Sequence, residues 1–139
     1  MSASVPNRDL KTDPNQRTAL VVDDVEDMLD LLEIALNFAQ FTVLRASSVS
    51  EALKVFEERS AEIDLLMTEV RVGPDSGLDL AGRLLASKPS LQVLAISALA
   101  RDRRLAVSRQ GIAFLPKPFS SSELRKKLSS LFPVVMASP

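Results

Sequence analysis

The chain has 139 residues, with 17 Lys and Arg against 18 Asp and Glu and a formal net charge of −1. Its length predicts a single domain. It contains no cysteine and no histidine, which excludes disulfides, thiolate zinc sites, cysteine nucleophiles and Ser-His-Asp catalysis. What remains is carboxylate, hydroxyl and lysine chemistry, together with hard cations held by oxygen ligands.

The charge balance also bears on partners and location. Dedicated nucleic-acid binders carry net positive charge and aromatic stacking platforms, whereas this chain is almost neutral and has no Trp or Tyr. No apolar run approaches the roughly 20 residues of a membrane helix, and the first residues contain no apolar signal core. We therefore expect a cytoplasmic protein with neither a nucleic-acid nor a membrane partner.

The two ends of the chain differ from its middle. Residues 1–17 are polar and include two prolines, so they predict a flexible N-terminal tail. The domain is expected over residues 18–132, with a short C-terminal tail at 133–139. These last residues are too few for a helix-turn-helix, so we expect any output to pass through protein contacts.

Five short apolar segments alternate with segments in which apolar residues recur every three or four positions. Short apolar runs of this kind are typical of buried parallel strands. The five segments are Thr18–Val22, Phe41–Leu44, Ile63–Thr68, Leu91–Ile96 and Ile112–Leu115. The alternation predicts an α/β fold, a doubly wound five-stranded parallel sheet with five helices.

Polar residues predict where the helices begin. Ser48 with Glu51, and Ser120 with Glu123, have the spacing of capping boxes, and Asp24 and Ser76 are predicted N-caps. The helical pattern is weakest over residues 100–109, which offer few apolar side chains to bury.

Chemically capable residues follow the predicted strands. Ligands of open α/β sheets bind outside the carboxyl ends of the strands, and at those ends the chain carries Asp23, Asp24, Glu69, Ser97 and Lys117. Each one alone is explained as a turn, cap or loop residue, but their matched positions favour a shared site. Clustered carboxylates attract a cation such as Mg²⁺. Together with a lysine and a hydroxyl nearby, these carboxylates are the kinds of groups that phosphoryl-transfer sites use.

Four sequence motifs resemble the response-regulator receiver domain of bacterial two-component signalling. They are VVDDVEDML, DLLMTEVRVGPDSGLDL, AISA and FLPKPF, and the resemblance covers about residues 18–132. It implies the flavodoxin-like receiver fold. It also implies a metal site formed by Asp23, Asp24, the side chain at position 69 and the backbone carbonyl of Arg71.

The same resemblance assigns roles to three further residues. Ser97 matches the switch hydroxyl, Phe114 the aromatic switch position and Lys117 the phosphate-sensing lysine. Family members often have a cis bond before the proline that matches Pro118, which the sequence leaves open.

One departure from the family changes the expected chemistry. The family has Asp at the phosphoacceptor position, where this chain has Glu69. The added methylene moves the carboxylate by about 1.5 Å, and a misplacement of about 1 Å can cost ~100-fold in rate. We therefore expect phosphorylation to be absent or very slow, and Mg²⁺ to bind weakly or not at all. A second departure, Gly73-Pro74 in place of Pro-Gly, puts the Arg71 carbonyl ligand in doubt.

Charge is unevenly distributed along the chain. Residues 23–33 carry six acids and no base, whereas 101–127 carry eight bases against two acids. The resemblance implies that the first helix docks a kinase and that the fourth helix, fifth strand and fifth helix form a dimer or target surface. The expected partners are a histidine kinase or a downstream target, with a homodimer through residues 101–131; the alternative is a merely solvated face.

Three functions remain in view. The first is a single-domain signalling receiver, not an enzyme, that binds protein partners without aspartyl phosphorylation because Glu69 replaces the acceptor. The second is a working phosphotransfer receiver that a histidine kinase phosphorylates at Glu69 or another acid. The third is a Mg²⁺-dependent phosphatase that uses the same edge of the sheet.

Overall fold

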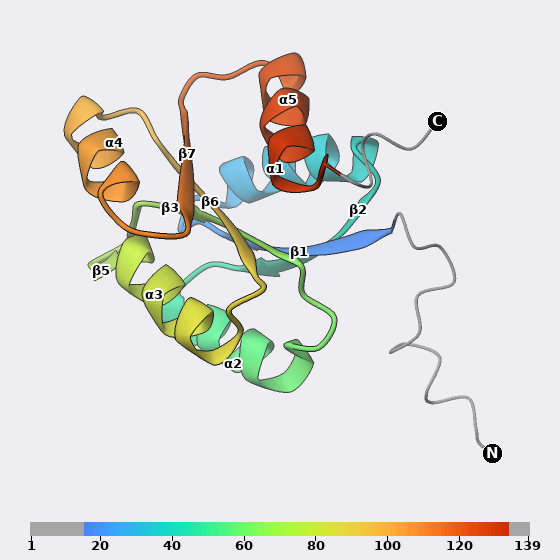
Figure 1. Cartoon of the computed structure of the whole chain (residues 1–139), viewed down its shortest axis with the longest axis vertical. Helices are drawn as coiled ribbons and strands as arrows, with labels where there is room; N and C mark the ends of the chain where they lie inside the picture. Colours follow the sequence, from blue (N-terminus) through green and yellow to red (C-terminus); the bar gives the residue numbers. More distant parts are fainter. Residues whose placement is uncertain (1–15, 134–139) are drawn as a thin grey trace.

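The computed structural model describes residues 16–133, so most of both predicted tails lies outside the described residues. The first strand begins at Arg17, one residue before the predicted start of the domain. Five parallel strands form one sheet in the order β2-β1-β3-β6-β7, and two further strands pair as an antiparallel hairpin (Figure 1). The predicted fold class, a doubly wound five-stranded parallel sheet with five helices, is confirmed.

The elements follow the predicted alternation along the chain. The strands are β1 (Arg17–Val22), β2 (Phe41–Ala46), β3 (Leu65–Glu69), β4 (Arg71–Val72), β5 (Asp75–Ser76), β6 (Gln92–Ser97) and β7 (Ile112–Pro116). The helices are α1 (Glu26–Phe38), α2 (Val49–Arg59), α3 (Gly77–Ser87), α4 (Ala100–Val107) and α5 (Ser121–Leu131).

Apolar side chains fill both faces of the central strands, which explains why those strands read as continuous apolar runs. On one face, α1 and α5 pack through residues such as Leu29, Leu36 and Leu128. On the other, α2, α3 and α4 contribute to a second core, with Phe56 and Ala106 among its members. The sheet is therefore covered on both sides, and its carboxyl edge is left for a site.

The register of the sheet aligns the ends of the strands. Val22 pairs with Thr68, Glu69 pairs with Ile96, and Ser97 pairs with Pro116. Residues that immediately follow β1, β3, β6 and β7 therefore meet at one edge, as the strand-end prediction requires.

Helix starts confirm most of the capping predictions. Ser120 and Glu123 form the full capping box, and Ser48 and Ser76 cap α2 and α3 through their hydroxyls. Glu51 does not complete the second box, because its carboxylate accepts from the amide of Ser47 instead.

The prediction that Asp24 caps the first helix is wrong. The N-cap of α1 is Val25, which makes no side-chain capping bond. Instead, Asp23 Oδ1 accepts a hydrogen bond of 2.9 Å from the Val25 amide. This two-residue side-chain turn moves the start of the helix one residue along the chain.

The loop between β3 and α3 contains a hairpin that the sequence pattern did not predict. Arg71 pairs with Ser76, and Val72 pairs with Asp75. Gly73 has φ +60 at the turn, a conformation that favours glycine because it has no Cβ. Across residues 16–133, no helix is both long and apolar enough to cross a membrane.

Candidate functional site

An ion pair joins two strand ends across the carboxyl edge of the sheet. Glu69 is the last residue of β3, and Lys117 directly follows β7. The Lys117 amide donates to the Ser97 carbonyl at 2.9 Å, which holds the lysine beside β6, and the Lys117–Pro118 bond is cis. The Lys117 ammonium donates a hydrogen bond to the Glu69 carboxylate. The pair is largely shielded from solvent.

Burial dominates the electrostatics of Glu69. It raises the pKa of the Glu69 carboxyl above its ordinary value, because removal from water disfavours the charged form. The hydrogen bond and the charge of Lys117 oppose this shift, whereas Asp23 and Asp24 add to it through repulsion. Lys117 is thus the group that offsets the cost of placing this carboxylate among other acids.

Asp23 is the second buried carboxyl at this edge. Only 1% of it is exposed, and its amide donates to the Ala46 carbonyl. Oδ1 accepts from the Val25 amide, whereas the buried Oδ2 has no hydrogen-bond partner among the described residues. Burial raises the pKa of Asp23, and the Val25 amide and the Lys117 charge oppose that rise. Asp24, next in the chain, is exposed.

Asp23, Asp24 and Glu69 are the acids predicted to hold a cation at this edge. Across residues 16–133, no three acidic side chains group in a way that holds a metal ion. The ammonium of Lys117 supplies positive charge to Glu69, and the Mg²⁺ shell of Asp23, Asp24 and Glu69 stays a prediction. The Arg71 carbonyl stays a prediction as a ligand.

Ser97 points away from the ion pair, into a buried contact with α4. Its hydroxyl donates to Asp102 Oδ2 at 2.7 Å and accepts from the Leu99 amide at 3.0 Å. Asp102 is buried, and its Oδ1 has no hydrogen-bond partner in the described part of the chain. Reasoning from the sequence missed Asp102. The available signal was an acid in the first turn of a helix, five residues after Ser97.

The two remaining predicted residues are Arg71 and Phe114. Arg71 is exposed in β4, and its guanidinium Nη2 lies 3.8 Å from Asp102 Oδ1. Phe114 is buried in β7. A shallow cavity of about 210 Å³ lies between Phe114 and the loop that precedes α4, with Ser97 and Arg103 in its lining.

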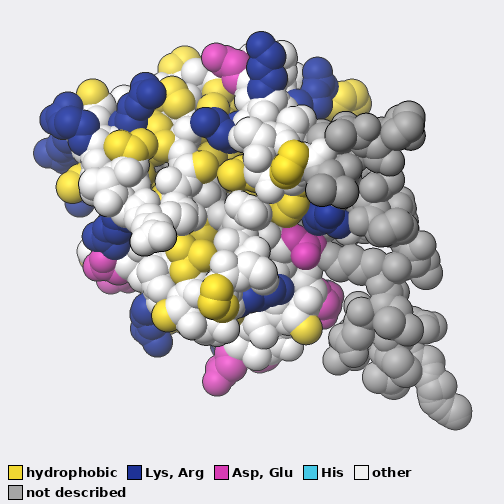
Figure 2. Space-filling view, viewed as in Figure 1, with side chains coloured by type: hydrophobic (Ala, Val, Ile, Leu, Met, Phe, Trp, Pro, Cys, Tyr) yellow, Lys and Arg dark blue, Asp and Glu magenta, His cyan; other side chains and the backbone are white. Residues whose placement is uncertain are grey.

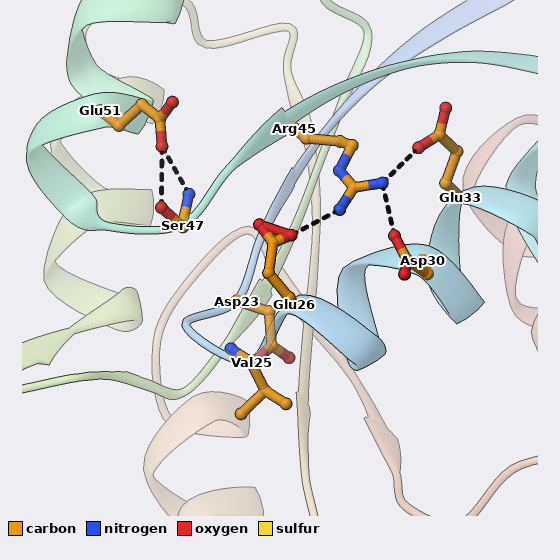
Figure 3. A network of polar contacts seen from close by, with 8 residues as sticks. All are labelled: Asp23, Val25, Glu26, Asp30, Glu33, Arg45, Ser47 and Glu51. Carbon is orange, nitrogen blue, oxygen red and sulfur yellow. Dashed lines mark hydrogen bonds and ion pairs between the residues drawn. The ribbon is translucent and has the colours of Figure 1, made fainter.

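A second polar network includes three of the six acids in residues 23–33 and leaves the other three outside it (Figure 3). Arg45, on β2, forms ion pairs of 2.8, 2.8 and 2.9 Å with Glu26, Asp30 and Glu33 on α1. The bonds to Glu33 and Asp30 raise the pKa of Arg45 above its ordinary value. This network fixes α1 to the edge of the sheet and places one positive charge among three of the six acids. Asp23 and Asp24 remain at the candidate site, and Asp27 remains on the helix surface.

Comparisons with known proteins agree with this architecture. The family model described as "Response regulator receiver domain" matches residues 19–129. The chain is 28% identical over 123 residues to the probable transcriptional regulatory protein TcrX of Mycobacterium tuberculosis, covering 87% of this chain and 52% of that protein. It is 33% identical over 111 residues to the sensor kinase CckA of Brucella abortus, covering 77% of this chain and 12% of that protein.

A solved structure shows the same fold. A response regulator receiver domain protein from Clostridium thermocellum superposes with a TM-score of 0.77 and 24% identity, covering 85% of this chain and 95% of that one. The chain spans about half of TcrX and a small part of CckA, so the similarity concerns a shared domain. The chain belongs to the response regulator receiver domain family of two-component signalling.

Proposed function

We propose that this receiver signals through contacts with protein partners and does not use aspartyl phosphorylation. The observation that carries the proposal is the ion pair between Glu69 and Lys117. Glu69 ends β3, where the family places its acceptor aspartate, and its carboxylate contacts the Lys117 ammonium. The lysine is therefore already occupied by an internal anion.

The charge and geometry of Glu69 support only a partial imitation of a phosphorylated acceptor. A carboxylate carries about −1 charge, whereas a phosphoryl group carries ≈ −1.5 to −2 and three strong acceptor oxygens. The Lys117 contact is formed, but the Ser97 hydroxyl is bonded to Asp102 instead. We infer a fixed state in which the lysine side of the pocket is satisfied and the hydroxyl side is held by α4.

Family membership and the relatives indicate the class of partner. One relative is named as a sensor kinase and another as a transcriptional regulatory protein. The partners proposed for this chain are a histidine kinase or a downstream target protein, met in the cytoplasm. We propose that the basic surface over residues 101–131 binds the target protein. The alternative for this surface is a symmetric homodimer.

The test is treatment of the full chain with acetyl phosphate and Mg²⁺, followed by intact mass under conditions that preserve acyl phosphates. Glu69→Asp restores the shorter side chain, and Glu69→Ala is the matched control without a carboxylate. We expect no mass gain for the wild type or Glu69→Ala, and a gain of one phosphoryl group for Glu69→Asp. Stoichiometric phosphorylation of the wild type at Glu69 or another acid would overturn the proposal and support a working phosphotransfer receiver.

A further inference from the structure

Helix α4 is attached to the sheet by few of its own side chains. Only Asp102 and Ala106 are buried within it, and its N-cap, Leu99, makes no side-chain capping bond. Figure 2 shows Lys and Arg side chains gathered over this helix. Because α4 buries so little apolar surface, its position depends on the contact that its buried aspartate makes.

That contact is made to the hydroxyl at the end of β6. Ser97 Oγ donates to Asp102 Oδ2 at 2.7 Å and accepts from the Leu99 amide at 3.0 Å. Ser97 and Asp102 are 4% and 2% exposed, so the bond between them is shielded from water. A serine hydroxyl has one proton to donate, and here Asp102 receives it.

Asp102 has no second hydrogen bond with which to replace this one. Its Oδ1 is buried and has no hydrogen-bond partner within residues 16–133. The guanidinium groups of Arg71 and Arg101 approach Oδ1 only to 3.8 and 4.0 Å, which supplies positive charge without a hydrogen bond. Turning the Ser97 hydroxyl away would leave a buried carboxylate unsatisfied, which is costly. Asp102 therefore holds the hydroxyl in its present direction.

The same hydroxyl lies beside the Glu69–Lys117 ion pair. The Lys117 amide donates to the Ser97 carbonyl at 2.9 Å, and Glu69 pairs in the sheet with Ile96, the residue before Ser97. An anion that binds Lys117 at this edge therefore approaches a hydroxyl whose proton is already engaged. We propose that Asp102 competes with such an anion for the Ser97 hydroxyl, and that this latch keeps α4 in place until the anion displaces it.

The latch concerns the regulation of the site and rests on the proposed function for its anion-bound state. In the wild type, Glu69 contacts the lysine and Asp102 holds the hydroxyl, so internal carboxylates engage both groups. Glu69→Asp is expected to free the lysine but not the hydroxyl. An anion could then bind while α4 stays in place, and the further removal of Asp102 would release the helix.

The first measurement needs no anion and no change at Glu69. Amide hydrogen exchange of the full chain compares the wild type with Asp102→Ala and Asp102→Asn. The matched control is Asp27→Ala, which removes an exposed acid from the first turn of α1. We expect exchange across α4 to be about tenfold faster in Asp102→Ala and unchanged in the control. Asp102→Asn retains an oxygen that accepts from the hydroxyl, so its α4 should exchange more slowly than that of Asp102→Ala.

The second measurement adds beryllium fluoride and Mg²⁺, a phosphoryl-like anion, to Glu69→Asp and to Glu69→Asp with Asp102→Ala. Amide NMR is expected to show shifts around Lys117 in both, but shifts across α4 only in the double variant. The double variant should also bind the anion about tenfold more tightly, because the hydroxyl proton no longer has to leave a buried carboxylate. Adding Ser97→Ala should abolish this gain in affinity.

The two measurements separate the latch from the proposed function. If Glu69→Asp does not bind the anion, the proposed function fails, whereas the exchange rates of α4 still decide the latch. Unchanged α4 exchange in Asp102→Ala would overturn the latch. So would equal exchange in Asp102→Ala and Asp102→Asn, because charge and not the hydroxyl bond would then hold α4. Shifts across α4 in Glu69→Asp with Asp102 intact, or an affinity gain that survives Ser97→Ala, would also overturn it.

Discussion

The Ser97 hydroxyl donates a 2.7 Å hydrogen bond to the buried carboxylate of Asp102. The bond ties the end of β6 to the first turn of α4, and Arg71 from the hairpin approaches the same carboxylate at 3.8 Å. Asp102 therefore links the end of β6, the first turn of α4 and the β4–β5 hairpin, although it does not itself lie at a strand end. A charge buried in this way is costly unless its hydrogen bonds are kept.

Removing the two partners of this bond is predicted to have unequal effects. Ser97→Ala leaves the buried Asp102 carboxylate without its hydrogen bond, which we expect to lower the free energy of unfolding by about 3 kcal/mol. Asp102→Ala removes the buried charge together with the bond, and we expect a loss of about 1 kcal/mol. Urea unfolding of both variants and of the double variant measures the coupling. A larger loss for Asp102→Ala than for Ser97→Ala would contradict this account of the contact.

Asp23→Asn is predicted to stabilise the chain at neutral pH. Burial raises the pKa of Asp23 in the folded chain, so folding is favoured while the carboxyl is protonated. That contribution is present below the ordinary pKa of 3.8 and is lost as pH rises through the raised pKa. Asparagine carries no charge and keeps an oxygen for the Val25 amide. We expect the variant to be more stable than the wild type at neutral pH.

The measurement for Asp23→Asn is chemical unfolding across an acid-to-neutral pH series. The advantage of the variant should shrink steadily toward the acid end, where Asp23 of the wild type is itself neutral. A variant less stable than the wild type at neutral pH would show that the ionised carboxylate contributes a favourable interaction.

Gly77→Ala is predicted to disrupt the end of β3. A Cβ at Gly77 would lie 1.9 Å from the Glu69 carbonyl oxygen and 2.7 Å from Thr68 Oγ1, so α3 must shift away from the strand that positions Glu69. We expect a loss of about 3 kcal/mol. The matched control is Gly82→Ala in the same helix, where no atom lies within 4 Å. There, alanine should stabilise by roughly 0.5–1 kcal/mol through its higher helix propensity.

Thermal unfolding of both glycine variants, side by side, checks this prediction. Equal melting temperatures for Gly77→Ala and the wild type would mean that α3 does not press against the end of β3.

Arg45→Gln is predicted to lower stability, most strongly at low ionic strength. Without the guanidinium, Glu26, Asp30 and Glu33 are three neighbouring acids with no counter-charge from β2. The variant should be less stable than the wild type at low ionic strength, and the difference should narrow in concentrated salt because screening weakens the repulsion. A difference that is constant across the salt series would assign the effect to packing.

Local sequence patterns predicted most of the elements of the fold. The apolar runs predicted all five strands of the sheet to within a few residues, because buried parallel strands need apolar residues on both faces. The capping serines Ser48, Ser76 and Ser120 were predictable because one side chain and one nearby amide define each cap. The β4–β5 hairpin was missed because strands of two residues have no periodicity.

Position along a strand was enough to predict which side chains lie close together at the carboxyl edge of the sheet. Asp23, Glu69 and Lys117 meet because parallel strands end at a common edge. The sequence-based prediction chose Asp24 instead of Asp23 as the acid that bonds at the start of α1, because the two are adjacent and chemically alike. The Ser97–Asp102 bond and the Arg45 network depend on how α4 and α1 are rotated against the sheet, which no sequence pattern specifies.

An amide NMR titration with beryllium fluoride and Mg²⁺, which together imitate a phosphoryl group on an acceptor carboxylate, tests most directly whether Glu69 has replaced phosphorylation in this pocket. We predict that wild-type signals around Asp23, Ser97 and Lys117 stay in place, whereas those of Glu69→Asp shift until one equivalent is bound. Saturable shifts of the same residues in the wild type would contradict the account, because they would show that Lys117 leaves Glu69 to bind a phosphoryl-like anion.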